Sequence, residues 1–285
     1  MLKLSIITVN LNNKPGLTRT LRSIVEQTYT NFEYIIIDGG SIDGSQQVIH
    51  DNVTAVNYWV SESDNGIYHA MNKGIQVAKG EYCLFLNSGD WLTEPNTLQH
   101  VFAGNPKTDI VSGDIYYYDN QANKIKWHIR SPEMVTAKTL FLGTLPHQAT
   151  LIKRRLFDVI GMYNEQLKIT SDWLFFVNAL LVHKCTYHHF NGTISYFNMD
   201  GISCDPKTKD LPRREQMRFL QQEYPMFVPD YKQLNILETQ AYQWIESREF
   251  RVYKFLERLG IIRFGVFCRR VKRVIQRNLF HEFTS

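Results

Sequence analysis

Residues 4–86 alternate short apolar runs with segments of helical period, and this alternation limits the fold more than any other feature of the chain. The apolar runs lie at residues 4–9, 34–37, 58–60 and 82–86. Runs that are apolar along their whole length are typical of strands buried on both faces. We therefore expect an α/β fold with a mainly parallel central sheet that helices cover on both sides.

Two segments between these runs each present one apolar helical face. The first face consists of Leu17, Leu21, Ile24 and Val25. The second face consists of Ile67, Met71, Ile75 and Ala78. Pro15 suits the first turn of the first helix, and Gly80 suits the end of the second. The order of strand, helix and strand is the one that parallel neighbours require, because their connection must cross the sheet.

A polar cluster lies at the end of each apolar run. The clusters are Thr8 with Asn10, residues 38–41, residues 63–65 and residues 87–90. Asp, Asn, Gly and Ser are ordinary turn residues, so any one cluster alone would be interpreted as a turn. Ligands of open parallel sheets bind beyond the carboxyl ends of the strands. Clusters at successive strand ends therefore predict a ligand site.

Several classes of site are excluded by what the chain lacks. The first strand-to-helix turn reads NLNNKPG, without the GxGxxG of dinucleotide-binding domains, and no P-loop is present. The cysteines are far apart, so neither a zinc site nor a disulfide framework is expected. The N-terminus lacks the pattern of a signal peptide, and no apolar window is long enough for a membrane span. We expect a cytoplasmic protein.

Five segments resemble the family 2 inverting glycosyltransferases, which have the Rossmann-like, nucleotide-sugar-binding GT-A fold. They are SIITVNLNN at 5–13, SIVEQTYTNFEYIIIDGGSIDGS at 23–45, SDNGIYHAMNKGIQVAKGEYCLFLNSGD at 63–90, PHQATLIKR at 146–154 and ITSDWLFF at 169–176. The similarity is greatest to members that build bacterial surface polysaccharides. It implies a GT-A catalytic domain over residues 1–204 and a helical C-terminal region over residues 205–285.

The resemblance also implies which residues hold the nucleotide-sugar donor, which we expect to be UDP-linked. Thr8, Asn10 and Asp38 would contact the base and ribose. An ionised carboxylate only accepts hydrogen bonds, so Asp38 suits a uracil N–H. Asp64 and Lys73 would lie against the nucleotide as well.

A divalent metal is implied at the end of the fourth strand, where the family has a DxD motif. Here the motif reads NSGD: Asn87 replaces the aspartate that faces the ribose, and Asp90 retains the carboxylate that holds the metal. Mn²⁺ or Mg²⁺ needs few protein ligands when it keeps waters and diphosphate oxygens. The alternative interpretation of NSGD is a simple type I turn.

Asp172 takes the place of the family's catalytic base, which removes the proton from the acceptor hydroxyl. Taken alone, Ser171 and Asp172 before an apolar run would indicate only a helix N-terminus. His147 follows Pro146 in a predicted loop, where it would lie near the diphosphate, metal or acceptor; the alternative is an ordinary loop histidine. Trp173 is expected to be a platform for a sugar ring. The alternative is that its side chain packs in the hydrophobic core.

The C-terminal region is basic and predicted to be helical over residues 213–259. Between Arg248 and Arg277 it has ten Lys or Arg and two Glu. Basic residues between apolar ones at 264, 267, 271, 274 and 275 predict an amphipathic helix that lies on an anionic membrane surface. The alternative is a helix docked on the catalytic domain. No nucleic-acid-binding module is recognisable, so no nucleic-acid partner is expected.

Two functions agree with these features. The first is a metal-dependent inverting glycosyltransferase that adds a hexosyl or N-acetylhexosaminyl group to a growing, lipid-linked surface glycan. The second is a catalytically weak nucleotide- or glycan-binding protein of the same fold, which the altered DxD motif would explain. Retention of both Asp90 and Asp172 favours the enzyme.

Overall fold

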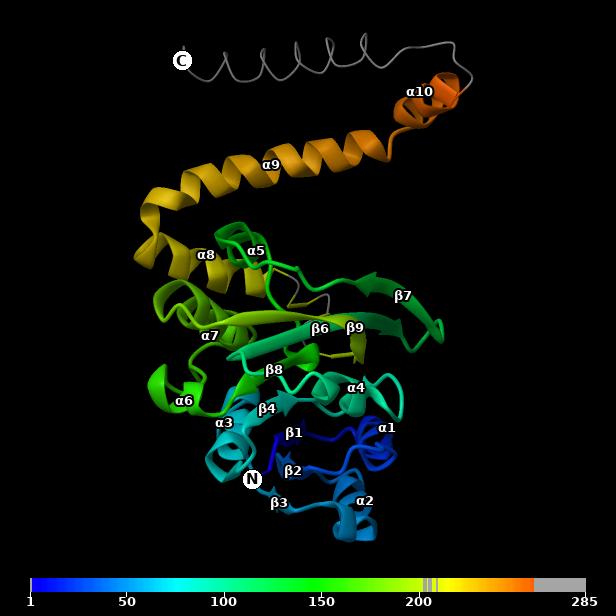
Figure 1. Ribbon diagram of the computed structural model, residues 1–285, viewed down its shortest axis with the longest axis vertical. Coiled ribbons are helices and arrows are strands. Elements are labelled where there is room, and N and C mark those ends of the chain that lie inside the picture. The colour runs from blue at the N-terminus through cyan, green and yellow to red at the C-terminus, as the bar shows by residue number, and fades with distance from the viewer. Residues whose placement is uncertain (1, 202–203, 205–206, 209, 259–285) are drawn as a thin grey trace. The chain divides into compact units, whose positions relative to one another are not determined.

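A computed structural model describes residues 2–201, 204, 207–208 and 210–258 (Figure 1). The chain forms two compact units, an N-terminal unit, Met1–Pro225, and a C-terminal unit, Met226–Ser285. The division falls beyond the boundary at residue 204 that the sequence pattern suggested. Each unit is described by itself.

The strands and helices of the N-terminal unit alternate along most of its length. In chain order they are β1 (Leu4–Asn10), α1 (Lys14–Val25), β2 (Phe32–Asp38), α2 (Ser45–Asp51), β3 (Tyr58–Ser61), α3 (Ile67–Val77), β4 (Tyr82–Phe85), β5 (Trp91–Leu92), α4 (Thr97–Ala103), β6 (Ile110–Asp119), β7 (Lys124–Ile129), α5 (Ala137–Leu142), β8 (Thr150–Lys153), α6 (Arg155–Val159), α7 (Ser171–Val177), β9 (Tyr187–Asn198) and α8 (Leu211–Glu223). Short helical turns lie at η1 (Val53–Ala55), η2 (His147–Ala149), η3 (Asn178–Val182) and η5 (Pro225–Phe227).

These strands form one sheet in the order β3-β2-β1-β4-β8-β6-β9-β5, with β7 paired to β6. The pairs among β1 to β4 are all parallel. Beyond β4 the sheet is mixed, because β8 runs antiparallel to both β4 and β6, whereas β6 and β9 are parallel. The alternation of residues 4–86 therefore predicted the parallel half correctly, and the longer strands β6 and β9 were not foreseen.

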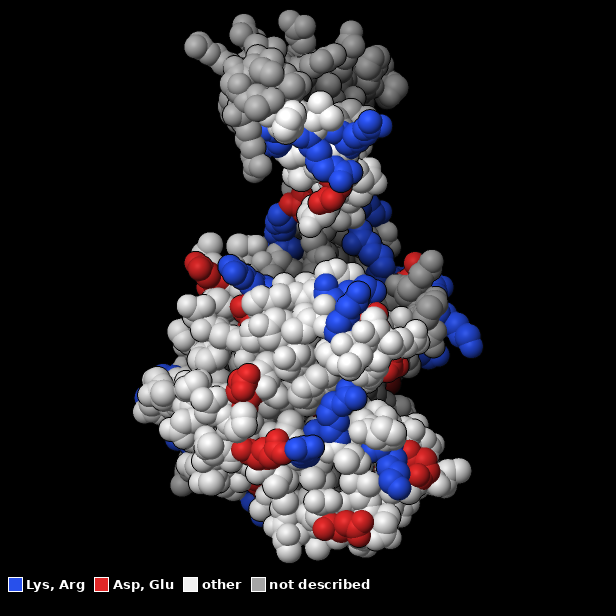
Figure 2. All heavy atoms as spheres, turned by 90° about the vertical axis from the view of Figure 1, so that its right-hand side faces the viewer, with Lys and Arg blue, Asp and Glu red and all other residues white. Residues whose placement is uncertain are grey.

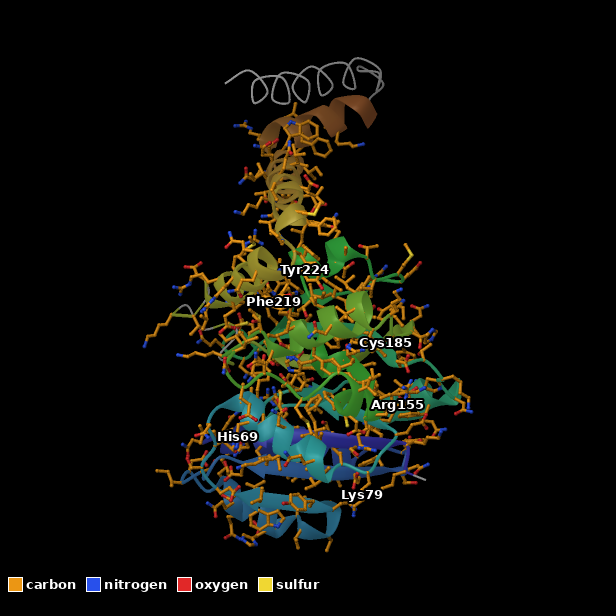
Figure 3. All side chains as sticks on the ribbon, turned by 90° about the vertical axis from the view of Figure 1, so that its left-hand side faces the viewer. His69, Lys79, Arg155, Cys185, Phe219 and Tyr224 are labelled. Carbon is orange, nitrogen blue, oxygen red and sulfur yellow. The ribbon has the colours of Figure 1, made fainter. Side chains whose placement is uncertain are left out.

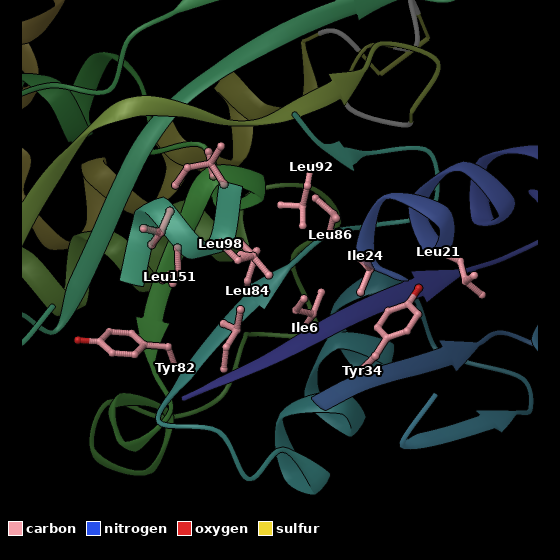
Figure 4. Close-up of a cluster of buried hydrophobic side chains, with 14 of the residues drawn as sticks. Ile6, Leu21, Ile24, Tyr34, Tyr82, Leu84, Leu86, Leu92, Leu98 and Leu151 are labelled. Carbon is pink, nitrogen blue, oxygen red and sulfur yellow. The ribbon is translucent and has the colours of Figure 1, made fainter. Parts of the chain in front are cut away.

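The hydrophobic core lies between this sheet and its helices (Figure 4). Ile6, Tyr34 and Leu84 come from three adjacent parallel strands, and each is completely buried. Leu21 and Ile24 of α1 pack in the same cluster. Full burial of an aliphatic side chain stabilises a fold by about 1.5–3 kcal/mol, so the apolar strand runs account for much of the core.

Helix α1 shows how local sequence places an element, and it also contains one correction. The side chain of Asn13 caps the helix by accepting a hydrogen bond from the Gly16 N–H at 3.1 Å, and Pro15 occupies the first turn. Leu17 lies on the buried face, as predicted. Val25 is 51% exposed, so it does not belong to that face. It is the last residue of the helix.

The C-terminal unit contains α9 (Val228–Ile245) and α10 (Arg248–Arg258). These helices, with α8, confirm the helical character predicted for residues 213–259, up to residue 258. The amphipathic segment beyond residue 260 lies outside the described residues. Among the helices that the structure describes, none has both the length and the apolar character needed to cross a membrane.

Candidate active site

The carboxyl ends of β1 and β2 place two predicted nucleotide-binding residues side by side. Asn10 and Asp38 are register partners at the ends of these parallel strands. Asn10 Nδ2 donates to Asp38 Oδ1 at 2.7 Å. Asp38 also accepts hydrogen bonds from the backbone N–H and hydroxyl of Ser41 and from the hydroxyl of Ser61. Both carboxylate oxygens are therefore used within the protein.

This network fixes the charge of Asp38. Burial opposes ionisation of the carboxyl, but the hydrogen bonds from Ser41, Ser61 and Asn10 outweigh it and hold its pKa below the usual value. The Oδ1 atom of Asn10 is buried and has no partner among the described residues. The network thus presents an ionised carboxylate in a fixed position, with one amide oxygen spare.

Thr8 is placed beneath this surface and not on it. Its side chain is completely buried, and its hydroxyl donates to the Leu86 carbonyl oxygen at 2.7 Å. The Tyr34 hydroxyl donates to Thr8 Oγ1 at 3.1 Å. Thr8 therefore ties β1 to the segment after β4, a position that suits a supporting residue better than a direct nucleotide contact.

Asp64 and Lys73 form an ion pair beside the N-terminal end of α3. Lys73 Nζ lies 2.6 Å from Asp64 Oδ1 and 2.7 Å from Glu62. His69, labelled on α3 in Figure 3, lies 2.9 Å from the same Asp64 oxygen. Asp64 Oδ2 is buried without a partner in the described part of the chain. Buried oxygens are rarely left unpaired, so this atom is available to a ligand donor.

The turn after β4 contains the predicted metal carboxylate. Gly89 has a φ of +109°, and a Cβ there would lie 2.9 Å from the Asn198 side chain, so only glycine fits. Asp90 is 4% exposed and accepts a hydrogen bond from the Asn198 backbone N–H at 2.8 Å. Asn87 Oδ1 is buried and lacks a partner among the residues that the structure describes.

The environment of Asp90 fits a divalent cation. Burial raises the pKa of its carboxyl to about 7, against smaller opposing effects of Asn198, His147 and Gln148. A cation beside a desolvated carboxylate would favour its ionised form. Within the described residues no group of three or more His, Cys, Asp or Glu is arranged to hold a metal. An ion bound at Asp90 would have to take its remaining ligands from elsewhere, such as water and a diphosphate.

His147 and Asp172 are in direct contact. The Nδ1 atom of His147, in η2, lies 2.8 Å from Asp172 Oδ2 in the first turn of α7. The Tyr68 hydroxyl of α3 lies 2.9 Å from Asp172 Oδ1 and 2.5 Å from the Ile169 carbonyl oxygen. On the other side of its ring, His147 Nε2 lies 3.4 Å from Asn87 Nδ2. The histidine thus bridges Asp172 and the end of β4.

Each of the two groups favours the charged form of the other. For Asp172, burial favours the neutral acid, but the hydrogen bond and charge of His147 prevail and lower the pKa. For His147, burial favours the neutral ring, but Asp172 and, more weakly, Asp90 raise the pKa. The expected ionised form of Asp172 therefore persists even though the side chain is only 11% exposed.

Trp173 lies in the core. The residue is 2% exposed, and its indole N–H donates to the Leu140 carbonyl oxygen. The ring packs edge-on against Phe219 of α8, which in turn contacts Tyr224, and both are labelled in Figure 3. No ring face is left for a sugar, so this position corresponds to the core alternative.

Three contributors to the site were not foreseen from the sequence, namely Tyr68, Ser61 and Asn198. Tyr68 lies in the segment 63–90, which resembles the family, and close to the polar cluster at residues 63–65. That position was the only sign in the sequence that Tyr68 could belong to the site. Asn198 acts through its backbone N–H, which no side-chain pattern reveals.

Comparisons with known proteins bear on the family and the fold. The model of the family described as "Glycosyl transferase family 2" matches residues 5–180. The chain belongs to glycosyl transferase family 2. A PGL/p-HBAD biosynthesis glycosyltransferase of Mycobacterium bovis is 33% identical over 225 residues, which are 75% of this chain and 84% of that protein. An uncharacterized glycosyltransferase of Mycobacterium tuberculosis is 32% identical over 182 residues, which are 62% of this chain and 69% of that protein.

Solved structures of glycosyltransferases share the fold. Staphylococcus aureus TarS in complex with UDP gives a TM-score of 0.55 at 19% identity, over 69% of this chain and 60% of that chain. The mannosyltransferase PcManGT from Pyrobaculum calidifontis, in complex with GDP-Man and Mn²⁺, gives a TM-score of 0.53 at 14% identity. The match covers 89% of this chain and 83% of that chain. The predicted family and GT-A fold are thus confirmed, and sugar transfer is the activity that family membership establishes.

Proposed function

We propose that this family 2 member is a metal-dependent inverting glycosyltransferase that uses a UDP-linked sugar. The observation that carries the proposal is the Asp172–His147 contact beside Asn87 and the Asp90 turn. This contact places the carboxylate of Asp172 and the titratable ring of His147 next to the end of β4, where we expect the diphosphate to bind. Such a combination suits removal of a proton close to a leaving phosphate.

In this reaction the acceptor hydroxyl attacks the anomeric carbon as its proton passes to the carboxylate of Asp172. The bond between that carbon and the diphosphate oxygen breaks, and the electron pair leaves with the nucleoside diphosphate. One displacement inverts the anomeric centre, so an α-linked donor gives a β-linked product. Neutralisation of the leaving charge is the chemistry that Mn²⁺ or Mg²⁺ would supply at Asp90.

The spare polar atoms of the strand ends support the donor assignment. Asn10 Oδ1, Asp64 Oδ2 and Asn87 Oδ1 are buried acceptors without partners in the described chain. A nucleoside offers N–H and O–H donors that match them. The proposed acceptor is a hydroxyl of a glycan or a lipid-linked oligosaccharide.

A donor screen tests the proposal. Thermal unfolding is measured with UDP-, GDP- and dTDP-linked sugars, with and without Mn²⁺, because a ligand of the folded state raises its melting temperature. The preferred donor is then incubated with oligosaccharide acceptors, and the anomeric configuration of the product is read by NMR. A Mn²⁺-dependent UDP-sugar shift and an inverted product are expected. A retained configuration would refute the single displacement.

A binding protein without turnover is the second candidate, because Asp90 is the only carboxylate left in the NSGD motif. Slow hydrolysis of the bound donor separates the two. An enzyme should release nucleoside diphosphate in a manner that needs Mn²⁺ and Asp172, whereas a binding protein should leave the donor intact.

We also propose that the C-terminal unit binds anionic membrane surfaces. On α10, Val252 and Phe255 are 50% and 61% exposed, among basic residues that include Arg248 and Arg251. On the face seen in Figure 2, by contrast, acidic and basic side chains of the N-terminal unit are interspersed. Each basic residue near such a surface contributes about 1 kcal/mol.

A vesicle flotation experiment tests this proposal. Truncation at Gly260 should weaken flotation with anionic vesicles. Full-length protein that does not float with these vesicles at low salt would refute the proposal.

A further inference from the structure

Helix α7, whose first turn contains the proposed base, is not capped by its own N-cap side chain. The N-cap residue is Thr170, and its side chain makes no capping hydrogen bond. The N–H groups at the start of a helix and in the turn that leads into it need acceptors from elsewhere. For the turn at residues 168–170 the acceptor comes from α8, which lies beyond the residues that the family model matches.

This acceptor is the carboxyl group of Glu215 in α8, which lies beside α7 (Figure 1). Its Oε1 atom accepts a hydrogen bond from the Lys168 N–H at 2.9 Å. Its Oε2 atom accepts from the N–H groups of Ile169 and Thr170, at 3.3 and 3.2 Å, and from the Thr170 hydroxyl at 2.8 Å. One carboxyl group thus holds three consecutive residues that end just before Ser171 and Asp172.

The same face of α8 also contacts the chain after Asp172. Phe219 lies four positions after Glu215, so the two side chains project from one face of the helix. The Phe219 ring packs edge-on against Trp173 at a centroid distance of 5.7 Å. Helix α8 therefore holds the chain on both sides of the proposed base.

The contacts of Glu215 reach the carboxylate of Asp172 by way of Tyr68. The Ile169 carbonyl oxygen lies 2.5 Å from the Tyr68 hydroxyl, which itself lies 2.9 Å from Asp172 Oδ1. A shift of residues 168–170 would therefore move the backbone that leads into Asp172 and the hydroxyl that contacts its side chain. Misplacement of a reacting group by about 1 Å can lower a rate about 10²-fold.

We propose that Glu215 is a positioning residue for sugar transfer and that it fixes Asp172 in place through the backbone of residues 168–170. This inference rests on the proposed function, in which Asp172 takes the proton of the acceptor hydroxyl. Glu215 takes no part in the proton transfer, and its effect on the rate is exerted only through Asp172. Helix α8 is therefore part of the catalytic unit, although the family model ends at residue 180.

The deciding variant is Glu215→Ala, which removes all four hydrogen bonds. The rate at saturating donor and acceptor should fall on the order of 10- to 100-fold, while the donor affinity, measured by calorimetry, should stay within about twofold. Glu215→Gln keeps an amide oxygen for Ile169 and Thr170, so it should recover most of the rate. If Glu215→Ala does not fold, Glu215→Asp, which is one methylene shorter, replaces it with a loss in the same direction.

A second carboxylate provides a matched control. Asp109 Oδ2 accepts hydrogen bonds from the N–H and the hydroxyl of Thr186 at 3.0 and 2.8 Å, the same pair of groups that Thr170 offers to Glu215. Asp109 directly precedes β6, outside the proposed site. Asp109→Ala should lower the melting temperature as Glu215→Ala does, but it should transfer at the wild-type rate well below both melting temperatures.

A double-variant cycle tests the route through Asp172. Glu215→Ala is added to Asp172→Asn, and residual transfer is measured in single turnovers with enzyme in excess. If Glu215 acts through Asp172, the second substitution should change the residual rate by less than about threefold, because the side chain that it positions is no longer a base. An independent effect would lower the residual rate by the same factor as in the wild type.

Loss of rate in Glu215→Ala with donor affinity kept, an active Asp109→Ala and an unchanged residual rate in the cycle support the inference. A rate within about threefold of wild type in the folded Glu215 variant overturns it, as does an equal loss in Asp109→Ala or in the cycle. If the wild type transfers no sugar from any donor, or if Asp172→Asn keeps the wild-type rate, the proposed function fails first, and the two failures are thereby distinguished.

Discussion

The strand-end region around Asp38 and the region around Asp172 are both built on a buried carboxylate, yet they differ in what is left unpaired. At Asp38 both oxygens are taken by Asn10, Ser41 and Ser61. At Asp172 the partners are the titratable ring of His147 and the hydroxyl of Tyr68, and the second nitrogen of that ring, Nε2, lies 3.4 Å from Asn87 Nδ2. We therefore propose that the first region holds the donor in place and that the second removes the proton of the acceptor.

The largest effect is expected from Asp172→Asn. Asparagine preserves the shape of the side chain, but an amide cannot take up the proton of the acceptor hydroxyl. Transfer should fall on the order of 10²- to 10⁴-fold with normal folding. Steady-state kinetics measures this, with exposed Asp158→Asn as the control. A rate within a few-fold of wild type would rule out Asp172 as the base.

The next effect concerns Asp90→Asn. The amide oxygen can still accept the hydrogen bond of the Asn198 backbone, so the turn should persist. Removal of a buried carboxylate with a raised pKa should not lower stability. Calorimetric titration with nucleoside diphosphate should lose its dependence on Mn²⁺. Unchanged Mn²⁺-dependent affinity would rule out Asp90 as the metal ligand.

A smaller effect is expected from Asp38→Asn, and it should appear in stability. The amide group would face at least one of the donors that Asp38 now accepts, and an unpaired buried donor costs about 1–3 kcal/mol. Because the pKa of Asp38 is lowered, the stabilisation by its ionised form is present above about pH 4 and is lost as the pH falls through the folded-state value. Urea unfolding at several pH values measures it, against exposed Asp51→Asn. An unchanged midpoint at neutral pH would contradict the network.

The smallest effect is a shift in the titration of His147. Its pKa is raised by Asp172 in spite of burial. Replacement of that carboxylate by the amide of Asp172→Asn removes the anion that favours the imidazolium, so the pKa should fall. NMR titration of the histidine ring measures the change without any turnover. A pKa that stays the same would mean that the two side chains do not interact in solution.

Sequence periodicity predicted the parallel half of the sheet because strand and helix patterns are local. The strand-end clusters at Asn10, Asp38 and Asp90 followed from that order, since parallel strands end at one edge. Contacts between distant segments could not be inferred in this way. Tyr68 meets Asp172 across 104 positions of sequence, and His147 meets it across 25. Both contacts depend on how α3, η2 and α7 pack together.

Burial of single side chains was equally inaccessible. Trp173 follows the proposed catalytic carboxylate and has the chemistry of a sugar platform, but Phe219 of α8, beyond the residues that the family model matches, packs against its ring. Thr8 was placed correctly at a strand end, and its hydroxyl points into the sheet. The direction of a side chain at a strand end depends on the next strand's position, which the local pattern does not contain.

The central claim is that the region around Asp38 binds the donor and the region around Asp172 removes the proton. The most direct test measures donor affinity and transfer rate for both Asp38→Asn and Asp172→Asn. We expect the two variants to fail in opposite ways: Asp38→Asn should bind the UDP-sugar more weakly and keep its rate at saturating donor, whereas Asp172→Asn should bind the donor normally and lose the rate. Loss of the same quantity in both variants would contradict the account.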